Sequence, residues 1–175
     1  MNNSATLRRV GPDEVATCLS ALADVLIDCV EGGASVSFML PMTREKAMEF
    51  WRSVAVGVVS GERVLLIAED ENGQIVGTVQ LVIGQPENQP HRADVAKMLV
   101  HRRVRRKGIG QRLMAEVEHV ARGENKSVLV LDTVTGGNAE RLYERTGWQR
   151  VGTVPNYALM PSGELCGTTI YCKQL

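Results

Sequence analysis

Apolar residues recur every three to four positions in four stretches of the chain, which predicts four helices packed by one face. In the first stretch Val15, Leu22 and Leu26 form the apolar side, whereas Asp24 and Asp28 fall on the side expected to face water. Gly32-Gly33 ends that helix, and 34–41 is expected to be a loop. The predicted helices run from Gly11 to about Val30, from the Thr43 cap to just before Gly61, from Ile109 to Arg122, and from Ala139 to Arg145.

Between these stretches the apolar runs are short, rich in Val, Leu and Ile, and bounded by turn residues, which is typical of strands. Asp70-Glu71-Asn72-Gly73 is a hairpin turn signal between two such runs, and 84–90 is a polar loop. The predicted strands are Arg63–Glu69, Gln74–Ile83, Ala93–Val100, Ser127–Asp132, Trp148–Val154 and Thr168–Lys173, with a possible first strand at Leu7–Val10.

The resulting order, ααβββαβαββ, places antiparallel-type strands on both sides of one strand–helix–strand crossover. That order predicts an α+β, or mixed α/β, fold. The length of 175 residues, with 44% hydrophobic and 23% charged residues, suits one globular domain over 1–175.

Twenty basic and twenty acidic residues give no net charge, and aromatic residues make up only 4%. A neutral chain with few aromatic rings is a poor candidate for coating nucleic acid or an anionic membrane. No apolar leader precedes Gly11, and the four cysteines form no CxxC pair, so reduced thiols, a cytoplasmic location and no metal site are expected.

Positive charge is concentrated in one segment, His101 to Arg112, which holds six Lys or Arg residues and no acid. It lies between a predicted strand and the first turn of a predicted helix, where backbone N–H groups are unpaired and the helix dipole is positive. Gly108 and Gly110 allow a ligand to approach the backbone. These features favour a phosphate or pyrophosphate site, and the alternative is a solvated basic turn.

Two better-known phosphate loops fit this segment less well. A Walker loop needs Lys-Ser or Lys-Thr after its second glycine, and Gln111-Arg112 stands there instead. A dinucleotide fingerprint needs a third glycine, which is missing.

The segment Met98-Leu99-Val100 followed by Arg105-Arg106-Lys107-Gly108-Ile109-Gly110 resembles the acetyl-CoA loop of the GNAT superfamily of N-acetyltransferases, Gln/Arg-x-x-Gly-x-Gly/Ala. Ala139-x-x-x-Tyr143-x-x-x-Gly147-Trp148 resembles the superfamily's next element. Four shorter segments, at 33–36, 92–95, 131–133 and 155–157, are similar to the tabtoxin-resistance acetyltransferase subgroup. The resemblance implies a mostly antiparallel sheet with a central splayed parallel pair flanked by helices.

The same resemblance implies a set of site residues. Acetyl-CoA is expected to lie with its pyrophosphate on the loop and its pantetheine along the preceding strand, between the strands of Asp94 and Asp132. Tyr143 is expected to protonate the departing thiolate, and either aspartate to attract the ammonium and relay its proton. The implied cofactor-binding residues are Met98, Leu99, Val100, Arg105, Arg106, Lys107, Gly108, Ile109, Gly110, Gln111 and Asn138.

Each catalytic candidate also has a purely structural interpretation. Asp94 is two residues from Arg92 and could be a paired surface charge, Asp132 could start a turn, and Tyr143 could be a core aromatic. Other side chains are expected to carry no chemistry. They are the surface histidines His91, His101 and His119, the core residues Met48, Phe50 and Trp51, and the loop residues Ser35 and Ser37.

The sequence departs from the family at one cofactor position. The family often has Asn seven residues before the tyrosine, where this chain has Gly136, and Asn138 is nearby but out of register. Whether Asn138 replaces that contact is left open.

The expected function is direct transfer of an acetyl group from acetyl-CoA, without a metal, to the amine of a small molecule that resembles an amino acid, toxin or antibiotic. The alternatives are a non-catalytic acyl-CoA sensor and a nucleic-acid-binding module that uses Arg102 to Arg112. A homodimer is a possible assembly, and neither nucleic acid nor a membrane is an expected partner.

Overall fold

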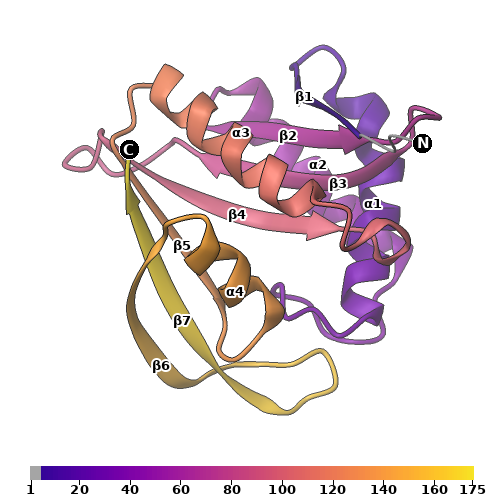
Figure 1. Cartoon of the computed structure of the whole chain (residues 1–175). Helices are drawn as coiled ribbons and strands as arrows, with labels where there is room; N and C mark the ends of the chain where they lie inside the picture. The colour runs from indigo at the N-terminus through magenta and orange to yellow at the C-terminus, as the bar shows by residue number, and fades with distance from the viewer. Residues whose placement is uncertain (1–4) are drawn as a thin grey trace.

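The computed structural model describes residues 5–175, so 1–4 of the expected 1–175 domain lie outside the described residues. Its single mixed sheet has seven strands in the order β1-β2-β3-β4-β5-β7-β6 (Figure 1). Only β4 and β5 run parallel. The strands are β1 Thr6–Val10, β2 Arg63–Glu69, β3 Ile75–Val82, β4 Arg92–Val100, β5 Val128–Val134, β6 Gln149–Leu159 and β7 Leu165–Gln174.

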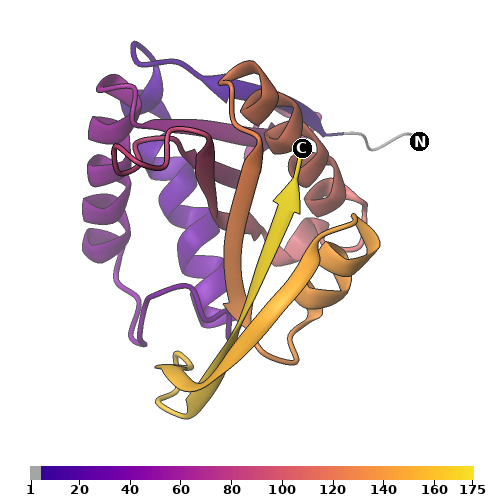
Figure 2. The ribbon, with the colours of Figure 1, turned by 90° about the vertical axis from the view of Figure 1, so that its left-hand side faces the viewer.

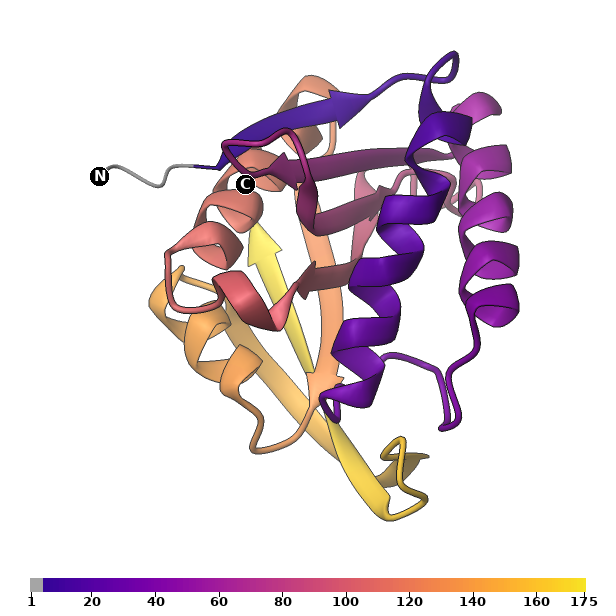
Figure 3. The same ribbon diagram turned by 90° about the vertical axis from the view of Figure 1, so that its right-hand side faces the viewer.

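Two pairs of helices cover opposite faces of the sheet (Figures 1 and 3). Helices α1 (Val15–Glu31) and α2 (Arg44–Val59) bury Leu22, Leu26 and Trp51 against one face. Helix α3 (Ile109–Gly123) packs Leu113 and Val117 on the other face, next to the short α4 (Asn138–Arg145). The chain therefore has two apolar cores separated by the sheet, and each helix buries one face, as its periodicity predicts.

The parallel pair is short, because β4 and β5 are hydrogen-bonded only from Arg92 opposite Val128 to Asp94 opposite Val130. Beyond that point β5 continues beside β7 alone, while β4 continues beside β3 alone. The two strands diverge in both views of the sheet (Figures 1 and 2). The expected splayed parallel pair is thus confirmed, and it leaves one edge of β4 without a strand partner.

A β-bulge interrupts β4 on the diverging part of the strand. Thr78 pairs with Leu99 and Gln80 with Ala96, so two residues of β4, Lys97 and Met98, lie opposite one residue of β3. Lys97 has a φ of 50°, in the left-handed region that few non-glycine residues adopt. The bulge changes the direction of the side chains just where β4 loses its partner.

The element order was predicted correctly, and the possible first strand is present as β1, antiparallel to β2. The last two strands are longer than expected. Strand β6 continues through Pro155 to Leu159, with a register shift between Val154 and Ala158 where Asn156 has a φ of 51°. Pro155 is tolerated because β6 is an edge strand, paired only with β7.

In the described part of the chain, no helix is long and apolar enough to cross a membrane. Nor does any group of three or more His, Cys, Asp or Glu side chains within residues 5–175 have the arrangement of a metal site. The four cysteines are free thiols, of which Cys18 and Cys29 are buried.

Candidate active site

The basic loop between β4 and α3 turns back on itself and presents backbone N–H groups. A 3₁₀ turn, η1 (Arg102–Val104), is followed by two left-handed residues, Arg106 with a φ of 64° and Gly108 with a φ of 78°. Within residues 5–175, none of the N–H groups from Gly108 to Gln111 donates to a backbone carbonyl. A curled backbone with unpaired donors at a helix N-terminus is an anion-binding arrangement.

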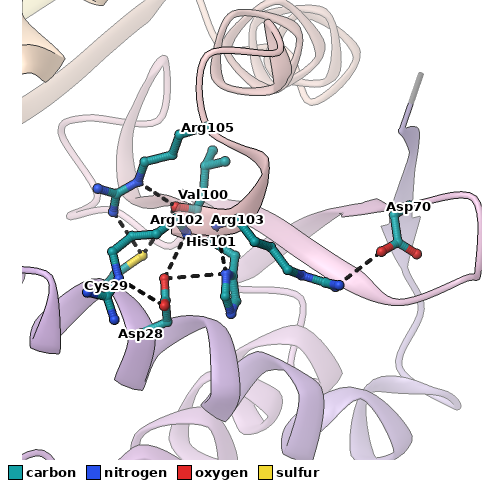
Figure 4. A network of polar contacts seen from close by, with 8 residues as sticks. All are labelled: Asp28, Cys29, Asp70, Val100, His101, Arg102, Arg103 and Arg105. Atoms are coloured by element: carbon teal, nitrogen blue, oxygen red, sulfur yellow. Dashed lines mark hydrogen bonds and ion pairs between the residues drawn. The ribbon is translucent and has the colours of Figure 1, made fainter. Parts of the chain in front are cut away.

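Three arginines of this segment hold the loop in place instead of pointing freely into solvent (Figure 4). Arg102 donates from its backbone N–H and its Nε to the Asp28 carboxylate of α1, at 2.8 and 2.9 Å. Arg103 donates to Asp70 at 3.1 Å, and Arg105 Nε donates to the Val100 carbonyl at 3.0 Å. The loop is thereby joined to α1, to the β2–β3 turn and to β4.

Two expectations about the surroundings of the loop are wrong. Asp28 does not face water, since its side chain is only 13% exposed and is enclosed by Arg102 and His101. His101 is half-buried, and its Nδ1 accepts a hydrogen bond from the Arg103 N–H and lies 3.5 Å from Asp28. The helical period alone cannot show that the basic loop folds over this end of α1.

The glycines of the loop leave room for a phosphate group. A Cβ placed on Gly108 would meet no atom within 4 Å, so the space beside this residue is open. Gly110 instead faces the interior, where a Cβ would lie 3.4 Å from Leu142 and 3.6 Å from the sulfur of Met98. Ile109 is buried beneath the loop. The residues present therefore fit a diphosphate on the outer side of the turn.

Tyr143 lies on α4 in an aromatic cluster, with its ring centre 5.7 Å from that of Tyr171 and 6.1 Å from that of Trp148. Only 5% of the residue is exposed. Its hydroxyl has no hydrogen-bond partner among the residues that the structure describes. Burial raises the pKa of this hydroxyl, and the negative charge of Asp132 raises it further. Tyr143 is therefore a protonated donor that no residue within 5–175 engages.

The structure separates the two aspartates that the sequence left as alternatives. Asp94 is bonded to Arg92, and its Oδ2 accepts from Gln85 Nε2 at 3.1 Å. Asp132 is exposed on the diverging part of β5, and its charge acts on both Tyr143 and Lys97. The charge of Asp132 thus reaches both Tyr143 and Lys97, whereas Asp94 is engaged elsewhere.

The remaining cofactor candidates lie on both sides of the divergence. Met98, Leu99 and Val100 form the end of β4, although the Val100 carbonyl already accepts from Arg105. Asn138 is the exposed first residue of α4, after a turn in which the Gly136 N–H donates to Glu140 at 2.8 Å. A contact of Asn138 with pantetheine stays a prediction.

The model of the Acetyltransferase (GNAT) family matches residues 34–148, well over half of the chain. The chain belongs to this family. The match includes the basic loop, the diverging strands and Tyr143, and the family activity is acetyl transfer.

Solved structures support the same fold for the GNAT chain. An N-acetyltransferase from Staphylococcus aureus Mu50 is 17% identical, with a TM-score of 0.78, and the alignment covers 97% of this chain and 98% of that one. The yncA protein of Salmonella typhimurium, solved with its cofactor acetyl-CoA, is 18% identical with a TM-score of 0.76 and coverage of 98% and 94%. Ribosomal-protein-alanine N-acetyltransferase from Brucella melitensis is 23% identical, with a TM-score of 0.77 and coverage of 97% and 99%.

The sequence reasoning missed several polar residues on the α1–α2 side of this GNAT site. Lys97 Nζ donates to Ser37 Oγ at 3.1 Å and lies 5.7 Å from the ring centre of Phe50. Trp51 is buried as expected, but Phe50 is only half-buried. Gln80 is fully buried, and the signal that could have found it is a polar residue inside an apolar strand.

Proposed function

We propose that this GNAT protein transfers the acetyl group of acetyl-CoA directly to the amine of a small molecule. The observation that carries the proposal is the presence of three features around the divergence of β4 and β5. They are the donor-lined turn at Gly108, the unpartnered edge of β4, and the pair Tyr143 and Asp132 on the opposite side of the divergence.

The first two of these features, the turn at Gly108 and the edge of β4, account for binding of the coenzyme. The N–H groups from Gly108 to Gln111 suit a diphosphate, and the positive end of α3 adds to the attraction. The open edge of β4 suits an extended amide-containing arm, which adds to a sheet edge through backbone hydrogen bonds. A β4 backbone N–H near Leu99 or Val100 could then polarise the thioester carbonyl.

Asp132 is the residue we assign to the amine. An amine is protonated at neutral pH, and carboxylates in general are too weak as bases to deprotonate it fully. Asp132 instead attracts the ammonium and passes its proton to water. The neutral nitrogen then forms the bond to the acetyl carbon as the carbon–sulfur bond breaks.

Tyr143 supplies the proton that the leaving sulfur needs. A thiol of this kind has a pKa near that of cysteine, about 8.5, so it leaves as a negatively charged thiolate. A nearby O–H donor stabilises that charge by hydrogen bonding and then by giving up its proton. Because burial raises the pKa of Tyr143, the hydroxyl is protonated at neutral pH. After it gives its proton to sulfur, the phenolate recovers one through water from the nitrogen, which loses a second proton as the amide forms. The first proton, lost from the ammonium before the attack, leaves to solvent.

A small acceptor is favoured over a protein tail. The support is the resemblance to the tabtoxin-resistance subgroup at 33–36 and 155–157, and the polar groups near Lys97, namely its hydrogen bond to Ser37 and the buried Gln80. We also propose the cytoplasm as the compartment, because all four cysteines are free thiols. A homodimer is compatible with the long exposed edge strand β6.

The alternatives make different predictions about the same loop. Arg102, Arg103 and Arg105 are bonded within the chain, which leaves few free cations for a nucleic-acid surface. A non-catalytic sensor would bind acetyl-CoA without turnover.

The deciding experiment measures acetyl-CoA binding by calorimetry and release of CoA thiol over a panel of amines. Binding with turnover of at least one amine supports the proposal. Binding without turnover supports the sensor, and DNA retention that survives saturating CoA supports the nucleic-acid module.

A further inference from the structure

A polar strip crosses β2, β3 and β4 on the α1–α2 side of the sheet, beside the proposed acetyl-transfer site. Arg63 NH1 donates to the Oε1 of Gln80 at 2.9 Å. Gln80 pairs in register with Ala96, next to the bulge at Lys97. The strip therefore begins under α2 and ends at the divergence of β4 and β5.

The donors of this strip outnumber its acceptors. Neither Arg63 nor Lys97 has a carboxylate oxygen within 4.0 Å in the described part of the chain, although Asp132 is close enough for its charge to act on Lys97. Gln80 is fully buried, and its Nε2 has no hydrogen-bond partner within residues 5–175. A buried amide donor without an acceptor is costly unless a ligand supplies one.

The surroundings of Lys97 are those of a ligand-binding cation rather than a solvated surface lysine. Ser37 Oγ accepts one of its hydrogen bonds, and its Nζ lies over the Phe50 ring, 5.7 Å from the ring centre. The φ of 50° at the bulge places the residue in a strained conformation. Burial lowers the pKa of this ammonium, Asp132 opposes that effect, and the charge of Arg63 adds to it.

We propose that Lys97, with Arg63 and Gln80 behind it, binds a carboxylate carried by the acceptor amine. The proposal rests on the function proposed above, because it assigns the acceptor end of the same site. Asp132 attracts the ammonium of that acceptor while Lys97 holds its carboxylate, so the two charges of a zwitterionic amino acid meet opposite charges. The acceptor class is therefore a free amino acid or a close analogue.

The test uses matched acceptors that differ only in the group at the carboxyl position, which is a carboxylate, a neutral amide or hydrogen. L-Leucine, L-leucinamide and 3-methylbutylamine share one apolar group, and equivalent triplets can be made from other amino acids. Initial rates of CoA release give kcat/KM for each compound with the full chain and saturating acetyl-CoA. We expect the acids of the preferred triplet to exceed their amides by about tenfold or more, as for a site built around buried donors.

Lys97→Met removes the cation and keeps the apolar stem. It should lower kcat/KM for the acids by about tenfold or more and leave the amides within about twofold. Lys97→Arg should restore part of the preference. The matched control is Lys46→Met, which removes an exposed lysine of α2 whose ammonium, within residues 5–175, donates only to the Pro41 carbonyl, and it should change neither series. Acetyl-CoA affinity should be unchanged in all three variants.

Calorimetric titration of the same triplets, in the presence of CoA, separates the two proposals. Binding of the acids without turnover would sink the enzymatic function and keep the carboxylate site. Turnover without preference for the acids, or equal losses for acids and amides in Lys97→Met, would overturn the carboxylate site and keep the function. Neither binding nor turnover with any triplet would overturn both.

Discussion

The Asp28 carboxylate on α1 accepts two hydrogen bonds from Arg102, one from the backbone N–H at 2.8 Å and one from Nε at 2.9 Å (Figure 4). This contact joins a helix on one face of the sheet to the loop that leads into α3 on the other face. A backbone donor is held as well as a side chain, so the contact fixes the path of the chain entering the proposed diphosphate turn.

Replacement of Asp28 should weaken coenzyme binding without touching the coenzyme. Asp28→Asn loses the charge and at least one of the two bonds, so the turn becomes more mobile and must be ordered on binding. We expect the Kd for acetyl-CoA to rise by about five- to tenfold in calorimetry. Asp24→Asn, on the same helix and bonded to exposed Arg44, is the control and should leave the Kd unchanged. Equal effects of the two variants would contradict the anchoring role.

The same contact predicts how stability depends on pH. Burial of Asp28 raises the pKa of its carboxyl, but the bonds from Arg102 and the charges of His101 and Arg102 outweigh it, so the pKa lies below its ordinary value. A carboxyl with a lowered folded pKa stabilises the protein above its unfolded pKa, and that stability is lost as pH falls through the folded value. Thermal unfolding of wild type and Asp28→Asn should therefore differ at neutral pH and converge below about pH 4. A constant difference in Tm down to the most acidic pH would count against this.

Gly108 should be replaceable for folding but not for coenzyme binding. A Val side chain would fill the open space beside the turn, where the diphosphate is expected, and it would adopt a positive φ at a cost of about 1–3 kcal/mol. Gly61→Val is a matched control, because Gly61 has a φ of 77° against 78° at Gly108 and also has no atom within 4 Å of a Cβ. We expect similar losses in Tm for both variants, with a rise in acetyl-CoA Kd of about tenfold or more only for Gly108→Val. If the affinity is equal in the two variants, the diphosphate lies elsewhere.

The sequence was enough to predict the element order and the basic turn, because periodicity and glycine placement are local signals. It could not show what depends on register and on contacts between distant segments. Asp28 has the spacing of a solvent-facing residue, and only the fold of the loop over α1 buries it. Lys97 gave no signal, since the bulge that redirects it depends on how β4 pairs with β3. Gln80 is the exception, as a polar residue within an apolar strand can be seen in the sequence alone.

The environments of the two aspartates predict different effects of removing their charge. Asp132→Asn should lower kcat/KM for the amine by about tenfold or more and leave acetyl-CoA affinity unchanged, since the charge of Asp132 acts at the proposed site of transfer, on both Tyr143 and Lys97. Asp94→Asn breaks an ion pair whose carboxylate is 40% exposed, which costs about 0–1 kcal/mol of stability and little activity. Steady-state kinetics of the two variants on one amine compares them directly. A larger loss in Asp94→Asn would reverse the assignment.

Removal of the Tyr143 hydroxyl should affect turnover alone. Tyr143→Phe keeps the tilted contact of the ring with Tyr171, and the hydroxyl has no hydrogen-bond partner within residues 5–175, so the Tm should change little. We expect kcat to fall by about 100-fold, a typical loss for a general acid, with acetyl-CoA Kd unchanged. Tyr171→Phe is the control, because that hydroxyl donates to Glu144 at 3.3 Å and is not assigned to the reaction. Since burial raises the pKa of Tyr143 above its usual value of 10, wild-type kcat should also show no alkaline loss near pH 10. A fall in kcat centred there, absent from Tyr143→Phe, would show that the hydroxyl ionises and is not the protonated donor assigned to it.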